Sequence, residues 1–165
     1  SDDYFHKLKV QKIVNEINKK KDIEFIQNLP RIKSGKKFKN KKNKNNPVSF
    51  WPYLAPESCI SFRRDLMIKF KKINHEFKNK FPDIWFGFRL GVYAYFYKKK
   101  FYTLNENLTF YESLGESKKY SFFGKNWIFR RKESFEYLKK ILKRSKDLNK
   151  NLDYLMTNIM LNLYK

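Results

Sequence analysis

The chain contains very little histidine or cysteine. Cys59 is the single cysteine, and His6 and His75 are the only histidines among 165 residues. A single cysteine excludes an internal disulfide and is typical of a reducing compartment. The three residues also lack the spacing of a Cys/His zinc site. Any catalytic or binding chemistry must therefore come from other residue types.

Long apolar runs are missing as well. No run approaches the roughly 18 apolar residues that a membrane-spanning helix needs, and the acidic, polar start is unlike a signal peptide. We therefore expect a cytoplasmic location. Aromatic residues make up 19% of the chain and hydrophobic residues 41%. This composition excludes a disordered tail and suffices for a domain with a real core.

Negative charge is scarce, because 38 lysines and arginines face only 16 acidic residues, for a net charge of +22. Such an excess indicates nucleic acid or an anionic membrane as a partner. However, lysine far outnumbers arginine, whereas surfaces that bind phosphate usually enrich arginine. Part of the excess is also what an A/T-rich genome produces. The charge thus indicates anionic partners in general and is only weak evidence for nucleic acid, which is an unlikely partner because no recognised RNA or DNA motif is present.

The hydrophobic pattern predicts a mostly helical α/β chain with a few short strands. Pro30 should end the first strand, and Asn105, Glu106 and Asn107 should form a turn between the last two. The lysine- and asparagine-rich segment 31–48 predicts a mobile basic loop, with a lid over a phosphate-bearing ligand as the alternative. The predicted helices are 4–20, 63–80, 83–97, 119–144 and 147–164, and the predicted strands are 22–27, the end of 51–61, 101–104 and 108–111.

The last predicted helix has an apolar stripe at helical spacing. Two arrangements would use this stripe: packing into the core, as in an ordinary helix, or contact with an anionic membrane. The stripe consists of Leu148, Leu152, Leu155, Ile159 and Leu163.

Two adjacent carboxylates, Asp2 and Asp3, stand just before the first predicted helix. Such a pair suits a divalent cation that bridges phosphates. Acidic residues at this position also cap helices and favour the first helical turn. The pair by itself favours the cap, so the choice between cap and metal ligand depends on the segments further along the chain.

Five short segments occur in an order that resembles family 2 glycosyltransferases, which have the GT-A fold. The opening SDDYF resembles the end of their Asp-x-Asp metal motif. The segment APESCISFRR resembles a strand leading into an Arg-Arg helix start, and PDIWFGFRL resembles the segment that carries the catalytic base. The segments, completed by NLTFY and NWIFRR, are residues 1–5, 55–64, 82–90, 107–111 and 126–131.

The resemblance implies an incomplete GT-A-like domain that lacks the N-terminal nucleotide-binding half. Residues 1–118 would form the C-terminal part of the catalytic domain, and residues 119–165 would form closing helices. The implied function is transfer of a sugar, with inversion, from a nucleotide-sugar donor to a glycan or lipid-linked acceptor in bacterial surface polysaccharide synthesis. This piece alone is expected to be inactive, and peripheral contact with the inner membrane is an open possibility. The alternative is a basic, aromatic-rich module that binds nucleic acid.

By the same resemblance, Asp83 is the catalytic base and Asp2 a ligand of a divalent cation, Mg²⁺ or Mn²⁺. For Arg89, an ion pair with Asp83 or Glu112 is an equally good expectation. Trp51 could stack on an acceptor sugar or belong to the core, and for Trp85 we favour the core. The residues expected to contact the donor, its diphosphate or the acceptor are Asp3, Trp51, Glu57, Ser58 and Arg89.

Overall fold

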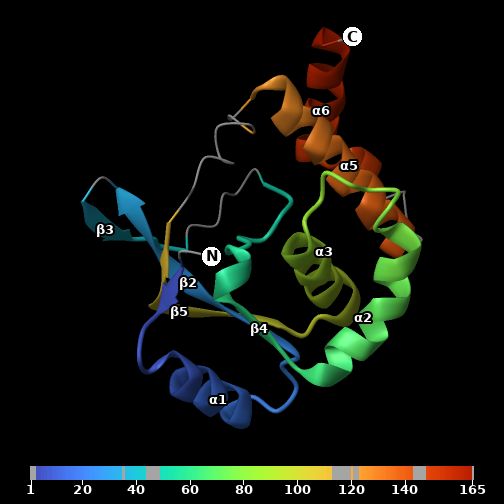
Figure 1. The fold of residues 1–165 in the computed structure, drawn as a ribbon. Helices are drawn as coiled ribbons and strands as arrows, with labels where there is room; N and C mark the ends of the chain where they lie inside the picture. The colour runs from blue at the N-terminus through green and yellow to red at the C-terminus, as the bar shows by residue number, and fades with distance from the viewer. Residues whose placement is uncertain are drawn as a thin grey trace.

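Two long parallel strands, β2 (Phe25–Ser34) and β5 (Phe101–Tyr111), form the centre of one open sheet (Figure 1). The computed structural model describes residues 3–34, 36–43, 49–112, 120, 123–142 and 148–164. On the free edge of β5, β1 (Tyr4–Phe5) pairs antiparallel. The opposite edge of β2 pairs antiparallel with β3 (Lys37–Asn40) and β4 (Ile60–Phe62). The described part of the chain is therefore mixed α/β, as predicted.

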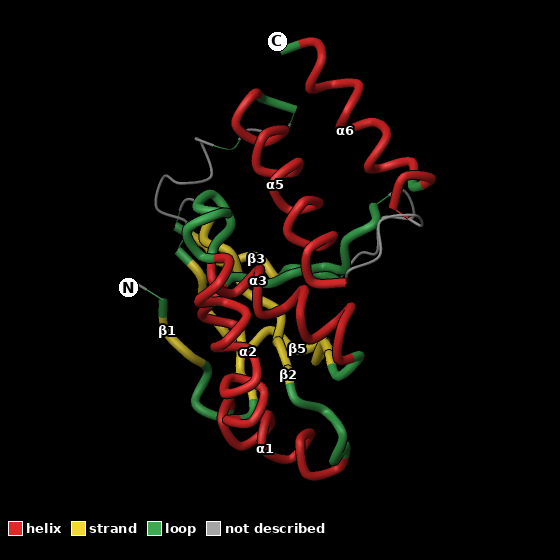
Figure 2. Tube along the Cα trace, turned by 90° about the vertical axis from the view of Figure 1, so that its right-hand side faces the viewer, coloured by secondary structure: helices red, strands yellow, loops and turns green. Residues whose placement is uncertain are grey.

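Helices lie on both faces of this sheet. They are α1 (Lys9–Lys19), α2 (Arg64–Phe77), α3 (Phe86–Val92), α5 (Lys125–Leu142) and α6 (Leu152–Leu163), with a π-helical segment η2 (Tyr93–Lys98) and 3₁₀ turns η1 (Glu57–Cys59) and η3 (Leu148–Lys150). The helices α5 and α6 lie side by side and extend beyond the sheet (Figure 2). In the described part of the chain, no helix is both long and apolar enough to cross a membrane.

Neighbouring residues of β2 belong to two different cores, because successive side chains of a strand point to opposite faces. Phe25 is fully buried in the larger core with residues of α2, α3 and α5, including Phe70 and Leu90. Ile26 is fully buried in the smaller core, beneath Ile13 of α1. The central strand is thus buried on both faces, and helices must cover both.

Both strand boundaries predicted at Pro30 and at residues 105–107 were wrong. β2 continues past Pro30 to Ser34, and β5 runs without a turn. The register between the strands shifts on both sides of Leu29, so residues 105 and 106 form a bulge instead of a turn. The bulge accommodates the missing N–H of Pro30, and the Pro30 carbonyl accepts hydrogen bonds from Lys41 N at 3.0 Å and Asn107 Nδ2 at 2.9 Å.

Most of the described part of the basic segment is strand and not the predicted loop, and only residues 36 and 41–43 of that part lie outside the strands. Residues 31–34 and 37–40 pair as a hairpin of β2 and β3, while residues 35 and 44–48 lie outside the described residues. The helix predicted from residue 4 begins at Lys9 because Tyr4 and Phe5 pair with β5. The helix predicted from residue 83 begins at Phe86 and becomes π-helical at Tyr93. Pairing between strands far apart in the sequence produces no local periodicity, so the sequence pattern did not predict β1.

A buried glutamine joins the segment before η1 to the sheet. Gln27 is fully buried, and its Nε2 donates to Tyr53 O at 2.8 Å and Thr103 Oγ1 at 2.9 Å. Its Oε1 accepts from Ala55 N at 2.9 Å. All the polar atoms of the side chain therefore have partners, as burial requires.

We predict that Gln27→Ala lowers the free energy of unfolding by about 2–4 kcal/mol, because it leaves buried backbone groups unpaired and opens a cavity. Gln11→Ala, at an exposed position of α1, is the matched control and should change stability by less than about 0.5 kcal/mol. Urea unfolding of the two variants measures the difference. Equal effects would show that the Gln27 contacts do not hold this segment.

Candidate functional site

A cavity of about 700 Å³ collects several of the residues singled out in the sequence. It lies beside β1 and η1 and reaches the starts of α3 and α5. Asp3, Glu57 and Ser58 line it, although 54 residues separate the first two. The complete lining is Asp3, Phe5, Leu54, Pro56, Glu57, Ser58, Trp85, Tyr111, Tyr120 and Arg130.

Glu57 is fixed in this cavity by a contact with the start of α3. Its Oε1 accepts a hydrogen bond from Gly87 N at 2.7 Å, which satisfies one of the unpaired N–H groups at the helix start and places a negative charge there. A Cβ atom at residue 87 would lie 2.7 Å from Glu57 Cγ and 2.9 Å from Ile60 Cδ1. The close approach of Glu57 to the start of α3 therefore needs glycine at position 87.

Asp3 is held at the other side of the cavity by the backbone. Its Oδ1 accepts a hydrogen bond from Glu112 N at 3.0 Å, just after β5 ends. Asp2 lies outside the described residues. Asp3 does not cap the first helix, because α1 begins at Lys9 with Leu8 at the N-cap position, and the Asp3 carboxylate accepts from Glu112 N instead.

A buried lysine lies behind this wall of the cavity. Lys9 is 5% exposed, and its Nζ donates to Ser58 O at 2.5 Å and to Thr109 Oγ1 at 3.1 Å. Thr109 also accepts from Asn28 Nδ2 at 3.0 Å, and the ammonium lies 3.7 Å from the centre of the Phe5 ring. These contacts join α1, β1, β2, β5 and η1 at one buried point.

Burial changes the acid–base chemistry of this cluster. It lowers the pKa of Lys9, and the nearby Cys59 and Asp3 offset only part of the shift. Burial also raises the pKa of the Cys59 thiol to about 11. Because thiolate is the reactive form, Cys59 is an inert buried residue, as predicted. The Ser58 hydroxyl, by contrast, is buried without a hydrogen-bond partner among the described residues.

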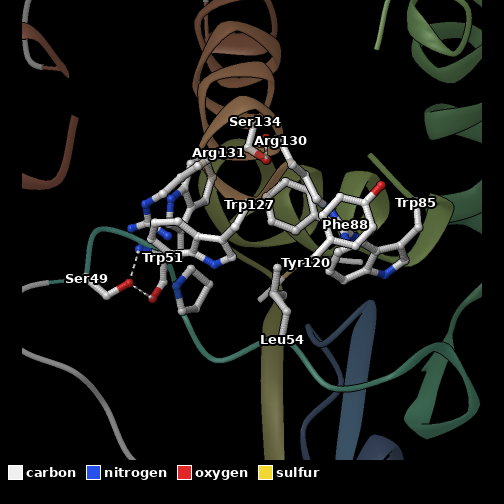
Figure 3. A pocket seen from close by; sticks show the side chains of 11 residues that line it. Ser49, Trp51, Leu54, Trp85, Phe88, Tyr120, Trp127, Arg130, Arg131 and Ser134 are labelled. Atoms are coloured by element: carbon white, nitrogen blue, oxygen red, sulfur yellow. Dashed lines mark hydrogen bonds between the residues drawn. The ribbon is translucent and has the colours of Figure 1, made fainter. Parts of the chain in front are cut away.

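A smaller cavity of about 240 Å³ adjoins the first and is lined mainly by aromatic rings and arginines (Figure 3). Residues 49–54, α3 and α5 supply its walls. Four residues line both cavities, namely Leu54, Trp85, Tyr120 and Arg130, so the two form one continuous groove. The other lining residues are Ser49, Trp51, Pro52, Phe88, Trp127, Arg131 and Ser134.

Arg130 lies at the junction of the two cavities. Its guanidinium carbon is 4.0 Å from the centre of the Trp85 ring and 4.3 Å from that of Tyr120, an arrangement that favours a cation over aromatic faces. The next residue, Arg131, forms a bidentate ion pair with Asp153 of α6. Asp153 also accepts from Phe50 N at 2.9 Å, so this pair fixes α6 and the 49–54 segment to α5.

The tryptophans differ in how far the structure buries them. Trp85 is 37% exposed at the groove, which corrects the expectation that it belongs to the core. Trp51 packs its ring against Phe88 and Phe135 at centroid distances of 5.3 and 4.8 Å. Its Nε1 is buried without a hydrogen-bond partner among the described residues. Trp51 is therefore both a core residue and part of the groove wall.

Asp83 and Arg89 do not line either cavity. Asp83 is exposed, two residues before Trp85, and its backbone N donates to Glu133 Oε1 at 3.2 Å. Burial raises the pKa of Glu133 more than this hydrogen bond lowers it. Arg89 forms neither expected ion pair among the described residues. It donates to Phe81 O at 3.4 Å, while Glu112 pairs with Lys33 at 2.7 Å.

The described residues contain no cluster of three His, Cys, Asp or Glu side chains that would enclose a metal ion. Magnesium commonly binds through one or two carboxylates together with substrate phosphates and water. Asp3, with one oxygen held by the backbone, fits such a site at the cavity wall. Asp3 would thus bind a cation together with a phosphate-bearing ligand.

Lys9, Tyr120 and Arg130 were missed as site residues in the sequence. Lys9 is one of several lysines in a helix that looks solvent-exposed. Arg130 lies in the NWIFRR segment, but its sequence position did not indicate that two rings would enclose it. The Arg-Arg pair beside Trp127 was the one available signal.

Neither family models nor curated proteins nor solved structures significantly match this chain.

We predict that Gly87→Ala destabilises the protein by about 1–2 kcal/mol, because the added methyl group displaces Glu57 and breaks the contact with the helix start. The matched background is Glu57→Ala, which removes the Cγ atom that obstructs the methyl group. In that background Gly87→Ala should lower the free energy of unfolding by clearly less. Urea unfolding of the wild type, the two single variants and the double variant gives the coupling energy between positions 57 and 87. If the two substitutions have additive effects on the free energy of unfolding, Glu57 does not contact position 87.

We further predict a pH-dependent difference between the wild type and Lys9→Met. Because burial lowers the pKa of Lys9, the unfolded state binds more protons over the range between the lowered value and the ordinary value near 10.5. The stability of the wild type relative to Lys9→Met should therefore rise as pH increases toward about 10.5. Urea unfolding at several pH values tests this, and a pH-independent difference would contradict it. Lys12→Met, at a partly exposed position of the same helix, is the control.

Proposed function

We propose that this chain forms part of an inverting glycosyltransferase that moves a sugar from a nucleotide-sugar donor to a glycan or lipid-linked acceptor. The observation that carries the proposal is the convergence of Asp3, Glu57 and Ser58 in one cavity. These residues lie in two of the segments that resemble family 2 enzymes, the end of the metal motif and the strand leading into an Arg-Arg helix start, and nothing local in the sequence requires the segments to meet. The resemblance rests on the order of segments in the sequence alone. The cavity brings residues of two of these segments together independently of that order, and this supports the proposal.

The cavity contains groups suited to a sugar diphosphate. Carboxylates and hydroxyls form hydrogen bonds with sugar hydroxyl groups, and carboxylates also bind a cation that carries phosphates; Asp3, Glu57 and Ser58 bring both kinds of group to the cavity lining. Lys9 provides a positive charge behind the wall, directly bonded to Ser58 O. A divalent cation bound at Asp2 and Asp3 would neutralise the leaving diphosphate.

In the proposed reaction, the acceptor hydroxyl oxygen attacks the anomeric carbon of the donor sugar. The bond from this carbon to the diphosphate oxygen breaks, and the nucleoside diphosphate leaves with the electron pair. Asp83 accepts the hydroxyl proton, and the attack from the opposite face inverts the anomeric centre. Asp83 lines neither cavity and precedes Trp85 by two residues, so this role requires the acceptor hydroxyl to extend past Trp85 to the exposed Asp83 carboxylate.

The aromatic part of the groove suits the acceptor. Sugar rings present apolar faces that stack on aromatic side chains, and Trp85 exposes its ring where the two cavities meet. Arg130 holds that ring from one side. Donor and acceptor would thus occupy neighbouring parts of one groove, with Trp85 between them.

We expect sugar transfer from a nucleotide sugar, in the presence of Mg²⁺ or Mn²⁺, by the product of the complete reading frame that encodes this chain. Asp83→Asn should lower kcat by about 100-fold or more, as loss of a general base does, with little change in KM. Asp65→Asn, an exposed residue at the start of α2, is the matched control and should retain activity. Initial rates over a panel of nucleotide sugars measure these effects.

Activity of Asp83→Asn within a few fold of the wild type would remove Asp83 from the base role. Glu57→Gln then tests the carboxylate that lines the cavity. Absence of transfer from every donor, together with nucleic-acid binding that falls steeply with salt, would contradict the enzyme proposal and favour the basic binding module.

A further inference from the structure

The apolar stripe of α6 faces solvent instead of the core. Leu152, Leu155, Ile159 and Leu163 follow one another at spacings of three or four residues, Met156 adjoins Leu155, and all five are between 43% and 79% exposed. The opposite face of α6 is the buried one, and it carries Asp153, Thr157 and Leu161. Of the predicted stripe, only Leu148 enters the core. A helix with its largest apolar side chains turned outward needs a partner for them.

Polar contacts fix this orientation of α6. The Asn151 side chain caps the helix by accepting from Asp153 N at 3.0 Å, and Asp153 pairs with Arg131. At the other end, Tyr164 Oη donates to Phe123 O at 2.9 Å. Turning the stripe inward would break the buried pair of Asp153 and Arg131, which is strongly unfavourable. The outward orientation of the stripe is therefore fixed by the fold.

Further apolar side chains extend the exposed surface at the end of the hairpin formed by α5 and α6. Phe123, Phe129 and Tyr164 are each at least 38% exposed, and the hydrogen bond between Tyr164 and Phe123 places two of them together. The phenylalanines add apolar surface, and the one tyrosine, with a polar end, is of the type found at a boundary between water and an apolar phase.

The charge of the protein selects among the possible occupants. A second copy would bring another +22 charges to the stripe, so repulsion opposes self-association. Exposed lysines on the hairpin have no carboxylate partner among the described residues, and they are Lys125, Lys132, Lys140 and Lys150. Scattered lysines match an anionic lipid surface, because attraction to headgroups needs no fixed geometry and adds up over the residues.

We propose that the stripe of α6 inserts into the interface of an anionic membrane, with lysines of α5 and η3 attracted to the lipid headgroups. The helix would lie along the surface, as amphipathic interfacial helices do. The contact is independent of the proposed transfer reaction, and it would bring the groove close to an acceptor carried by a lipid.

The test is co-sedimentation of the whole chain with vesicles of equimolar phosphatidylglycerol and phosphatidylcholine, and with vesicles of phosphatidylcholine alone. The stripe variant is Leu155→Gln with Ile159→Gln, which keeps helix propensity and replaces only exposed side chains. The matched control is Val10→Gln with Val14→Gln on α1, where both valines are exposed, at 73% and 47%, and have the same spacing. Both variants should unfold like the wild type.

We expect binding to the anionic vesicles only, weakened by at least about tenfold in the stripe variant and unchanged in the control variant. This result should hold at about 0.15 M salt, where purely electrostatic adsorption is screened. Equal binding of both variants would overturn the proposal in favour of adsorption by charge alone. Absence of vesicle binding would overturn it too, as would a wild-type dimer in solution that the stripe variant loses. None of these outcomes depends on sugar transfer, so the function proposal stands or fails separately.

Discussion

The parallel pairing of β2 with β5 is the constraint on which the rest of the structure depends. Parallel strands expose two faces that must both be covered, and here Phe25 and Ile26 begin two separate cores. The register shift near Leu29 lets the pairing continue past Pro30. As a result β5 is long enough for its end to reach β1 and Asp3, so the position of the cavity follows from this one pairing.

The cavity wall combines rigidity with buried charge. Lys9 joins elements that lie 49 and 100 residues away in the sequence through Ser58 and Thr109, and Glu57 contacts Gly87 at the start of α3. Such a network orders the side chains that face the cavity before any ligand arrives, which reduces the free-energy cost of binding. The same atoms thus stabilise the fold and shape the groove.

The hairpin of α5 and α6 has a different relation to the core. Phe135, Tyr137 and Leu138 of α5 are buried in the larger core. The ion pair between Arg131 and Asp153 fixes the orientation of α6. With this pair and the Asn151 cap in place, Leu161 is buried, whereas Leu152, Leu155 and Leu163 face solvent. A helix that looks from its periodicity like a core helix is therefore turned outward by a polar contact.

The sequence by itself determined the helices with strong periodicity, such as α2, the mixed α/β class and the buried state of Cys59. A resemblance in segment order predicted binding roles for Asp3, Glu57 and Ser58, which line one cavity, and roles for Asp83 and Arg89, which line neither; these roles stay predictions. Tertiary structure alone decided the course of β2 and β5 through Pro30 and residues 105–107, because a bulge depends on the partner strand. It alone revealed the burial of Lys9, the enclosure of Arg130 by two rings and the outward face of α6. Periodicity shows which residues share a face of a helix, but only long-range contacts decide whether that face meets the core or the solvent.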